Sequence, residues 1–155
     1  MGQKQGWEHK LYRNTGTFGS PTWDLVPNCR DLTMPSPASA NDASIRGSRV
    51  KMYGAGQIDL SFQWQMVADA ADTDYTVLRT AHFAQTAIDL MDLDGPIATS
   101  GSLGIRAICQ IFTFDQNEPL DGTVLTDVEA KPTYDTTNGG AHLVLGGGSP
   151  TFTAI

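Results

Sequence analysis

The sequence predicts a mostly β protein with one α-helix. Residues 56–67, GQIDLSFQWQMV, alternate apolar and polar side chains, and this period of two is typical of a strand that buries one face. Residues 72–85, DTDYTVLRTAHFAQ, are the best window with helical spacing of apolar residues. A chain of 155 residues without internal repeats is expected to form a single domain, residues 1–155, with a substantial core.

The first third of the chain predicts little regular packing. Residues 1–22 are rich in Gly, Thr and Asn and are expected to form an extended arm. Residues 23–34 have strand composition, but Pro27 within them favours an edge strand or a bulge. Residues 35–48, PSPASANDASIRGS, have no period, which predicts a long polar loop of the kind that is functional or disordered.

The strand at 56–67 has two very different faces. Its apolar side chains are those of Ile58, Leu60, Phe62, Trp64 and Met66. Its polar side chains are those of Gln57, Asp59, Ser61, Gln63 and Gln65. The apolar face requires a core, whereas the polar face is rich in glutamine and has one acid and no base.

The second half of the chain alternates strands and turns after the helix. Asp72 or Thr73 is expected to cap the helix, with Asp74 favourably placed at the positive end of its dipole. TAIDLMDL, LGIRAICQIFTF and the alternating residues 123–131 predict three strands. The glycine-rich residues 136–155 predict a mobile tail, or a strand that becomes ordered only on a partner.

Charge is distributed unevenly along the sequence. Ten basic and seventeen acidic residues give a net charge of −7, which disfavours tight binding of phosphates. Residues 1–51 carry +3 and the remaining chain carries −10. This asymmetry has two interpretations: chance combined with solubility, or basic N-terminal elements that meet acidic surfaces of neighbouring copies.

Several functional classes lack support. No apolar run approaches the roughly 18 residues that span a bilayer, so membrane insertion is not expected. Cys29 and Cys109 are distant in sequence and are interpreted as small buried residues of a protein made in the cytosol. His9, His82 and His142 are isolated, and His82 is interpreted as a partly buried helix residue rather than a ligand.

Motifs of catalysis and cofactor binding are incomplete or absent in the sequence. There is no P-loop and no G-x-S-x-G, and GAGQID at 54–59 lacks the third glycine of a dinucleotide fingerprint. DLMDLDG at 89–95 would place Leu90 and Gly101 at ligand positions of a calcium loop. Asp89 and Asp92 have no aromatic cleft around them for glycoside hydrolysis. No enzyme, cofactor or metal site is therefore predicted.

Several short stretches follow one another in a distinctive order: TGTFGSPTW, CRDLTM, IRGSR, DYTVLRTAHF and EPLDGTV. In this order they resemble the major tail tube proteins of long-tailed, siphovirus-like bacteriophages, and the resemblance extends from about residue 10 to residue 135. It implies a small β-sandwich or half-barrel with one flanking helix. It also implies hexameric rings that stack into a hollow tube around a tape-measure protein, with double-stranded DNA later passing through the lumen.

The resemblance assigns roles to particular segments. Ring-to-ring contacts are expected from the long loop, residues 35–51, and from the arms, residues 1–22 and 136–155. Gln57, Asp59, Ser61, Gln63 and Gln65 are expected to line the lumen, where neutral amides and an acidic ring would avoid gripping DNA. Arg46, Arg49 and Lys51 are expected to reach Asp69, Asp72 and Asp74 on the adjacent ring. The alternative for each set is an ordinary solvated surface.

The resemblance also implies further partners and a location for the protein, and it leaves rival functions open. A tail tube subunit would bind its own copies and the tape-measure, tail-tip and tail-terminator proteins. It would be found in the virion tail after assembly in the host bacterial cytoplasm. The alternatives are the inner tube of a contractile tail or related secretion apparatus, and a β-sandwich module that binds glycans or cell surfaces. Of the three tryptophans, only Trp7 is expected to be free for glycan binding.

Overall fold

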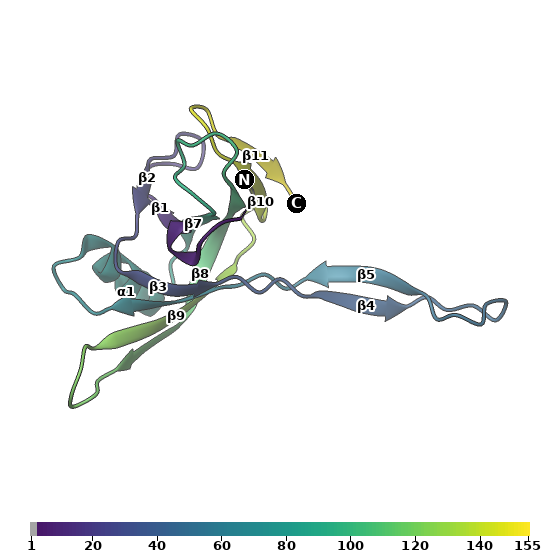
Figure 1. Ribbon diagram of the computed structural model, residues 1–155, viewed down its shortest axis with the longest axis horizontal. Helices are drawn as coiled ribbons and strands as arrows, with labels where there is room; N and C mark the ends of the chain where they lie inside the picture. Colours follow the sequence, from purple (N-terminus) through teal and green to yellow (C-terminus); the bar gives the residue numbers. More distant parts are fainter. Residues whose placement is uncertain (1–2) are drawn as a thin grey trace.

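Antiparallel strands dominate the computed structural model, which describes residues 3–155 and contains one α-helix in that part of the chain (Figure 1). The strands are β1 (Lys10–Asn14), β2 (Trp23–Leu25), β3 (Cys29–Thr33), β4 (Ala38–Asp42), β5 (Tyr53–Ile58), β6 (Phe62–Val67), β7 (Ile88–Leu93), β8 (Leu103–Asn117), β9 (Leu125–Pro132), β10 (His142–Leu145) and β11 (Thr151–Ala154). The helix is α1 (Thr73–Ala84), and a short 3-10 helix, η1, spans Gly6–Glu8. The predicted mostly β fold with one helix is confirmed.

The long strand β8 organises the main sheet. The order of this sheet is β2-β1-β7-β8-β9-β6-β3, with β10 and β11 attached beside β8. The first part of β8 pairs with β7 on one edge and with β10 on the other, while the part from Cys109 to Asn117 pairs with β9. Within residues 3–155, no strand pairs with the β7-side edge of β8 beyond Cys109. The sheet therefore ends at β2 and β3, and the β7-side edge of β8 is also unpaired over residues 110–117.

The main core lies between the sheet and α1. Phe62, Trp64 and Met66 of β6 are at most 3% exposed, and Leu78 and Ala81 of α1 belong to the same cluster. The predicted apolar face of the strand at 62–66 is therefore confirmed. A strand that presents every second residue to one layer of helix needs only this face to be apolar. The side chains on the opposite face of β6, those of Gln63, Gln65 and Val67, are not buried in this core.

A second, smaller cluster binds both ends of the chain into the sheet. Leu11 and Leu90 belong to the main core, whereas the residues next to them, Tyr12 and Met91, belong to the second cluster. Adjacent strand residues point to opposite faces, so β1 and β7 are buried on both sides. Phe152 of β11 packs against the second cluster.

The predicted arm and tail are thus partly wrong. Residues 10–14 of the expected arm form β1 between β2 and β7, and residues 142–154 of the expected tail form β10 and β11. Strands of four or five residues are too short for a readable period, so the need for a partner strand is not visible in the sequence. Residues 1–2 of the arm lie outside the described part.

The predicted continuous strand at 56–67 is divided in two. β5 ends at Ile58 and β6 begins at Phe62, while the amides of Asp59 and Ser61 donate to the carbonyls of Pro37 and Pro35 at 2.8 and 3.1 Å. Ile58 is 55% exposed rather than buried because β5 has left the core. The alternating pattern therefore holds from Phe62 to Met66 and fails before it.

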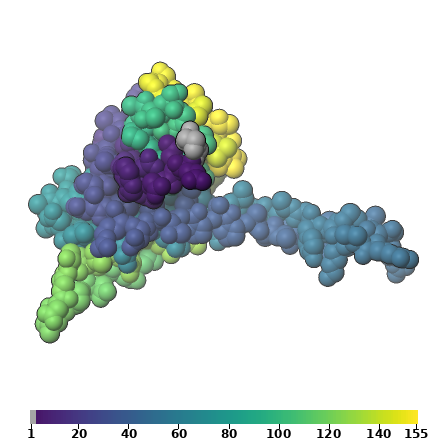
Figure 2. Space-filling view, viewed as in Figure 1, coloured from purple at the N-terminus to yellow at the C-terminus, as the bar shows by residue number. Residues whose placement is uncertain are grey.

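The segment predicted as a long loop contains a strand. Ala38–Asp42 forms β4, which pairs antiparallel with β5 in a separate two-stranded sheet. Figure 1 shows this β4–β5 hairpin projecting far from the rest of the molecule, and Figure 2 shows that no other segment covers it in the same view. All five residues of β4 are exposed, which explains why no apolar period predicts it.

The helix agrees with its prediction. Asp72 caps α1, since one oxygen of its carboxylate accepts a hydrogen bond from the Asp74 amide at 3.0 Å. The helix ends at Gln85, which adopts a left-handed conformation with φ 55°. His82 is half-buried and its Nδ1 lies 2.9 Å from the Ile111 carbonyl oxygen, in agreement with its interpretation as a packed helix residue. Both cysteines are free, Cys109 buried and Cys29 half-buried.

Candidate functional site

A polar face lies opposite the helix on the part of the sheet formed by β3, β6, β9 and β8. Residues paired directly across antiparallel strands share a face. One row joins Gln63, Glu129 and Thr113, and the next joins Gln65, Asp127 and Asp115. We call these six residues the polar face. It contains three acids, and β3 adds Thr33 and Arg30 at its edge through pairing with Gln63 and Gln65.

Two of the five predicted lumen residues belong to this polar face, and they are Gln63 and Gln65. Asp59 lies at its end, where its carboxylate is 3.9 Å from the Lys131 ammonium, which is itself 3.8 Å from Glu129. Gln57 is exposed but lies on β5 of the projecting hairpin. The placement of Ser61 on the polar face is wrong: it is 5% exposed because the chain turns between β5 and β6 and shifts the alternation.

The acids of the polar face were missed as site residues. Asp127 and Glu129 come from β9 and Asp115 from β8. The signal was present, because residues 123–131 alternate apolar with polar side chains as regularly as the strand at 62–66 does. The pairing of β9 with both β6 and β8, which brings the polar sets together, is a long-range property that the alternation does not contain. The sequence of residues 56–67 contains no base, but the neighbouring strands do contribute bases beside the polar face, namely Lys131 on β9 and Arg30 on β3.

The tip of the β4–β5 hairpin carries the predicted basic residues. We call residues 43–52 the basic tip; it contains Arg46, Arg49 and Lys51 and no acid, and all three bases are exposed. Ser44 and Ser48 stabilise its shape by hydrogen bonds to the main chain of Met52 and Val50 at 3.0–3.5 Å. Ile45 and Val50 are 63% and 71% exposed. The basic tip is therefore an ordered surface with both charge and apolar area.

Of the three acids predicted to receive these bases, one is unsuitable and one is occupied. Asp74 is 4% exposed, and its carboxylate accepts a hydrogen bond from the Arg13 Nε at 2.7 Å. Burial raises the pKa of Asp74, and the Arg13 guanidinium acts in the opposite direction. Asp72 caps α1 and also accepts from the Asn28 side chain at 2.9 Å. Asp69 is the exposed member, with one oxygen accepting from the Ala71 amide.

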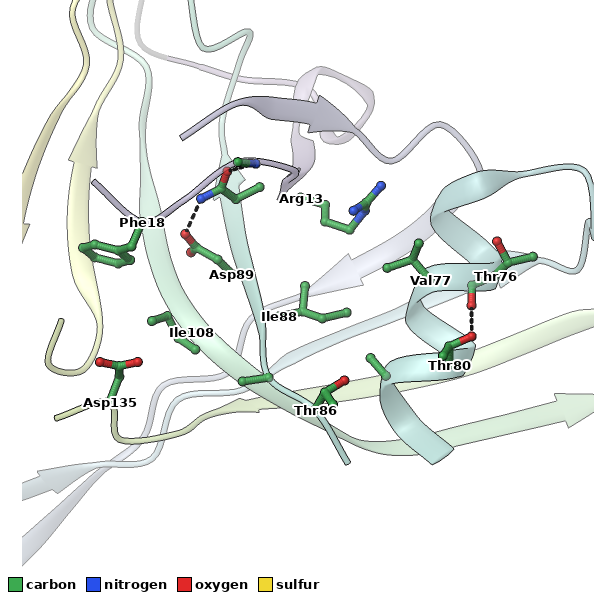
Figure 3. Close-up of a pocket in the computed structure, with 14 residues that line it drawn as sticks. Arg13, Phe18, Thr76, Val77, Thr80, Thr86, Ile88, Asp89, Ile108 and Asp135 are labelled. Carbon is green, nitrogen blue, oxygen red and sulfur yellow. Dashed lines mark hydrogen bonds between the residues drawn. The ribbon is translucent and has the colours of Figure 1, made fainter. Parts of the chain in front are cut away.

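A hollow of about 630 Å³, large enough for a small molecule, lies between α1 and β7. Figure 3 shows Asp89 on its wall hydrogen-bonded to a neighbouring side chain, which is that of Asn14 at 3.0 Å. Asp89 also accepts two bonds from the Arg106 Nε, at 3.1 and 3.0 Å, and Arg13 on the same wall pairs with Asp74. The third charged residue of the lining, Asp135, accepts from the amides of Thr137 and Asn138, so each charged group around the hollow already has a partner within the subunit.

Metal-ligand clusters and membrane-spanning helices are both absent from the described part of the chain. Residues 3–155 contain no cluster of three or more His, Cys, Asp or Glu side chains arranged to hold a metal ion. No helix among them is long and apolar enough to cross a membrane. Trp7 is 77% exposed, while Trp64 is in the main core and Trp23 packs against the second cluster, as expected for the three tryptophans.

Comparison with known proteins gives information at the level of structure only. No protein-family model matches the sequence. No curated protein matches it either. Among solved structures, a subunit in the tail of an empty gene transfer agent particle, solved with C6 symmetry, has a TM-score of 0.67 at 17% identity. The alignment covers 98% of this chain and 100% of that one.

Two other solved structures have related folds. The tail tube of SPP1 has a TM-score of 0.65 at 12% identity and covers 83% of this chain and 75% of its own. A chain in the baseplate of the anti-feeding prophage has a TM-score of 0.50 at 6% identity, with 81% of this chain and 87% of that chain covered. This chain therefore has the fold of tail tube subunits, as the sequence resemblance implied.

Proposed function

We propose that this protein is the subunit of a phage-type tail tube, in which six copies form a ring and the rings stack into a hollow tube. The observation that carries the proposal is the polar face on the β3-β6-β9-β8 part of the sheet, which is bounded by two unpaired edges, in a chain with the fold of tail tube subunits. A helix covers the other face, so the polar face is available to a water-filled space. The subunit has a structural rather than a catalytic role.

The open edges of the sheet are the surfaces that would join neighbours within a ring. β3 ends the sheet on one side, and residues 110–117 of β8, which have no partner on the β7 side, bound the other side of the part that carries the polar face. Unpaired strand edges present rows of N–H and C=O groups that bind another strand. If the β3 edge of one copy pairs with the β8 edge of the next, the ring closes into a barrel in which both of these edges are paired.

In such a barrel the polar face would line the lumen. Asp115, Asp127 and Glu129 give it an excess of acid, with Lys131 and Arg30 at its margins. A wall that neutralised phosphates would release counterions from DNA and hold it. An acidic, amide-rich wall instead lets double-stranded DNA pass. The other partners that we propose are the tape-measure, tail-tip and tail-terminator proteins, in a virion tail assembled in the host cytoplasm.

The decisive experiment is negative-stain electron microscopy of the purified protein over a concentration series, with size-exclusion light scattering in parallel. We expect rings or hollow tubes with a stain-filled centre. The mass of the smallest ring divided by the subunit mass of 16.6 kDa should be six. A monomer at every concentration, with no polymerisation on tail-tip complexes used as initiator, would contradict the proposal.

The inner tube of a contractile tail or secretion apparatus is the second candidate. The similarity to a chain of the anti-feeding prophage baseplate favours it, although the TM-score of 0.50 is lower than that for the gene transfer agent tail. The two functions share ring architecture and differ in whether a sheath surrounds the tube. A sheath gene beside the gene for this protein, and sheathed tubes in particles, would favour the second candidate.

A further inference from the structure

The basic tip has the composition of a binding surface without a partner in its own subunit. β4 and β5 pair only with each other, and Ile45, Val50 and Tyr53 are each more than 60% exposed. Arg46, Arg49 and Lys51 form no ion pair within residues 3–155. An ordered hairpin that exposes apolar side chains between bases is expected to bury them against an acidic surface that also has apolar area.

The loop between β8 and β9 provides such a surface. Residues 118–124, which we call the acidic tip, contain Glu118 and Asp121 and no base. Leu120 between these acids is fully exposed. Asp115 and Asp127 on the flanking strands add charge of the same sign, so residues 115–127 carry four acids and no base. In Figures 1 and 2 the β8–β9 hairpin projects on the side of the molecule opposite to the β4–β5 hairpin.

Other acids of the protein are largely occupied. Those with hydrogen bonds or ion pairs include Asp24 with Arg13, Asp42 with Ser44, Asp94 with Leu103, Asp135 with Thr137 and the pairs described above. The carboxylates that have no such partner within residues 3–155 are Asp31, Asp115, Glu118, Asp121 and Asp127. All but Asp31 lie in or beside the acidic tip. The largest concentration of free negative charge is therefore at this end of the molecule.

We propose that the basic tip of one copy docks on the acidic tip of a second copy in the adjacent ring. This inference rests on the proposed tube function and names the surface that receives the hairpin. The two tips differ, so the contact is head-to-tail and leaves a free basic tip and a free acidic tip at the ends of every stack. Arg46 and Arg49 face Glu118 and Asp121, while Ile45 and Val50 cover Leu120. The contact repeats around each ring, so weak individual pairs add up.

A charge exchange between two variants tests this contact. The tip variant is Arg46→Glu with Arg49→Glu, and the receptor variant is Glu118→Lys with Asp121→Lys. Each alone places like charges together, and we expect the protein concentration needed for tubes to rise about tenfold or more. When the two variants are mixed, reversed tips meet reversed receptors, and tubes are expected to return near the wild-type concentration. Electron microscopy and light scattering measure both effects.

Two control variants separate this contact from a general effect of charge. Arg79→Glu with Thr80→Glu and Ala84→Glu changes the charge as much as the tip variant does, at exposed sites on α1 away from the hairpin, and should assemble like wild type. Asp69→Lys tests the other acid considered as a receptor and is also expected to assemble normally. A tip variant whose assembly is restored by Asp69→Lys, rather than by the receptor variant, would overturn the assignment of the acidic tip.

A disulfide between copies provides a second readout that does not disturb charge. Val50→Cys with Leu120→Cys in one chain should give, on oxidation of tubes, a ladder of covalent oligomers beyond the dimer. The parent chain, in which Cys109 is buried and Cys29 half-buried, is the control and should give none. The inference would be overturned if the wild-type protein forms tubes but mixing the two charge variants does not restore assembly and oxidation gives no covalent oligomers. The proposed tube function would not be affected by that result. A wild-type protein without rings or tubes would contradict the proposed function itself.

Discussion

Arg106 is a buried residue whose guanidinium contacts Trp23 and Phe152, two aromatic residues that pack against the second cluster. Its side chain is 1% exposed, its guanidinium binds Asp89, and the guanidinium carbon lies 3.7 Å from the ring centre of Phe18 and 4.7 Å from that of Phe152. A guanidinium can pair with a carboxylate in its plane and contact rings above it. It thus connects β8 with the loop after β1 and with β11 near the end of the chain.

Replacing Arg106 by Met tests this connection. The change leaves the Asp89 carboxylate buried with only Asn14 as a side-chain partner, and we expect a loss of about 3–5 kcal/mol in the free energy of unfolding. Adding Asp89→Leu should recover most of the loss, because no unpaired charge remains. Urea unfolding of the monomer measures both. Arg79→Met on the exposed face of α1 is the control, with an expected change below about 1 kcal/mol. Equal losses at Arg106 and Arg79 would contradict the argument.

Asp92 makes the stability of the protein depend on pH. It is 6% exposed, one of its carboxylate oxygens has no hydrogen-bond partner, and its nearest base is the His9 Nδ1 at 3.9 Å. Burial raises the pKa of Asp92 to about 6, an effect that His9 opposes and Asp94 increases. An acid whose folded pKa lies above its unfolded value holds a proton more firmly in the folded state. Its contribution therefore becomes less favourable as pH rises from about 4 to about 6.

Asp92→Asn is expected to remove this dependence. At pH 7 the wild type keeps a buried charge that the amide lacks, so the variant should be more stable by on the order of 2 kcal/mol. At pH 4 the wild-type carboxyl is protonated in the folded state and about half protonated in the unfolded state, so its charge changes the free energy of unfolding by less than about 0.5 kcal/mol and the two proteins should unfold at similar urea concentrations. Urea midpoints at pH 4 and pH 7 give the comparison. If the urea midpoints of the two proteins differ by the same amount at pH 4 and at pH 7, the charge of Asp92 does not cause the difference in stability.

The β4–β5 hairpin is an element whose removal should separate folding from assembly. It pairs only within itself, so its loss exposes little of the main core. Ala40 and Ala55 face each other across the hairpin, and a two-residue Asn-Gly turn replacing residues 41–54 would join them with favourable geometry. We expect the shortened protein to unfold at nearly the wild-type urea concentration and to form no stacked tubes. Loss of the folded state instead would show that the hairpin stabilises the subunit.

The predictability of an element depended on whether its pattern was local. β6, α1, β7, β8 and β9 are long or strongly periodic, and each was predicted near its observed position. β4 has small polar residues exposed on both faces, and β10 is four residues long, so neither has a local signal. Their strand partners, β5 and β8, are what stabilise them. Two of the six residues of the polar face, Gln63 and Gln65, were predicted from the sequence, whereas the acids of β8 and β9 required the sheet order.

At the scale of the molecule, the uneven charge of the sequence becomes a spatial separation. Of the bases in residues 1–51, Arg46, Arg49 and Lys51 are gathered on the basic tip, whereas Arg13 is used inside the subunit for Asp74. The excess acid is concentrated on the polar face and the acidic tip. Charge totals along the chain left open whether two surfaces of opposite sign exist. Only the fold specifies which residues reach them, since Asp72 and Asp74 were assigned to the acidic surface and are occupied by the helix cap and the Arg13 pair.

The lumen hypothesis is a statement about the whole tube, and Gln63→Lys with Gln65→Lys tests it. Both side chains lie on the polar face, opposite the core, so subunits should fold and tubes should assemble as in wild type. The added lysines would neutralise phosphates of DNA inside the tube and release counterions, so DNA should be retained more strongly at low salt than at high salt. We expect a smaller fraction of the variant particles to deliver their DNA. This fraction should rise toward the wild-type value as the salt concentration increases.

Thr80→Lys with Ala84→Lys is the matched control for these lysines. It adds the same charge on α1, on the other side of the sheet, where both residues are exposed and away from the proposed lumen. Particles with this control should deliver DNA like wild type. Normal delivery by the Gln63 and Gln65 variant would place the polar face outside the DNA path. Reduced delivery by both variants would trace the effect to net charge, because lumen electrostatics require that the position of the lysines, and not their number, decides the outcome.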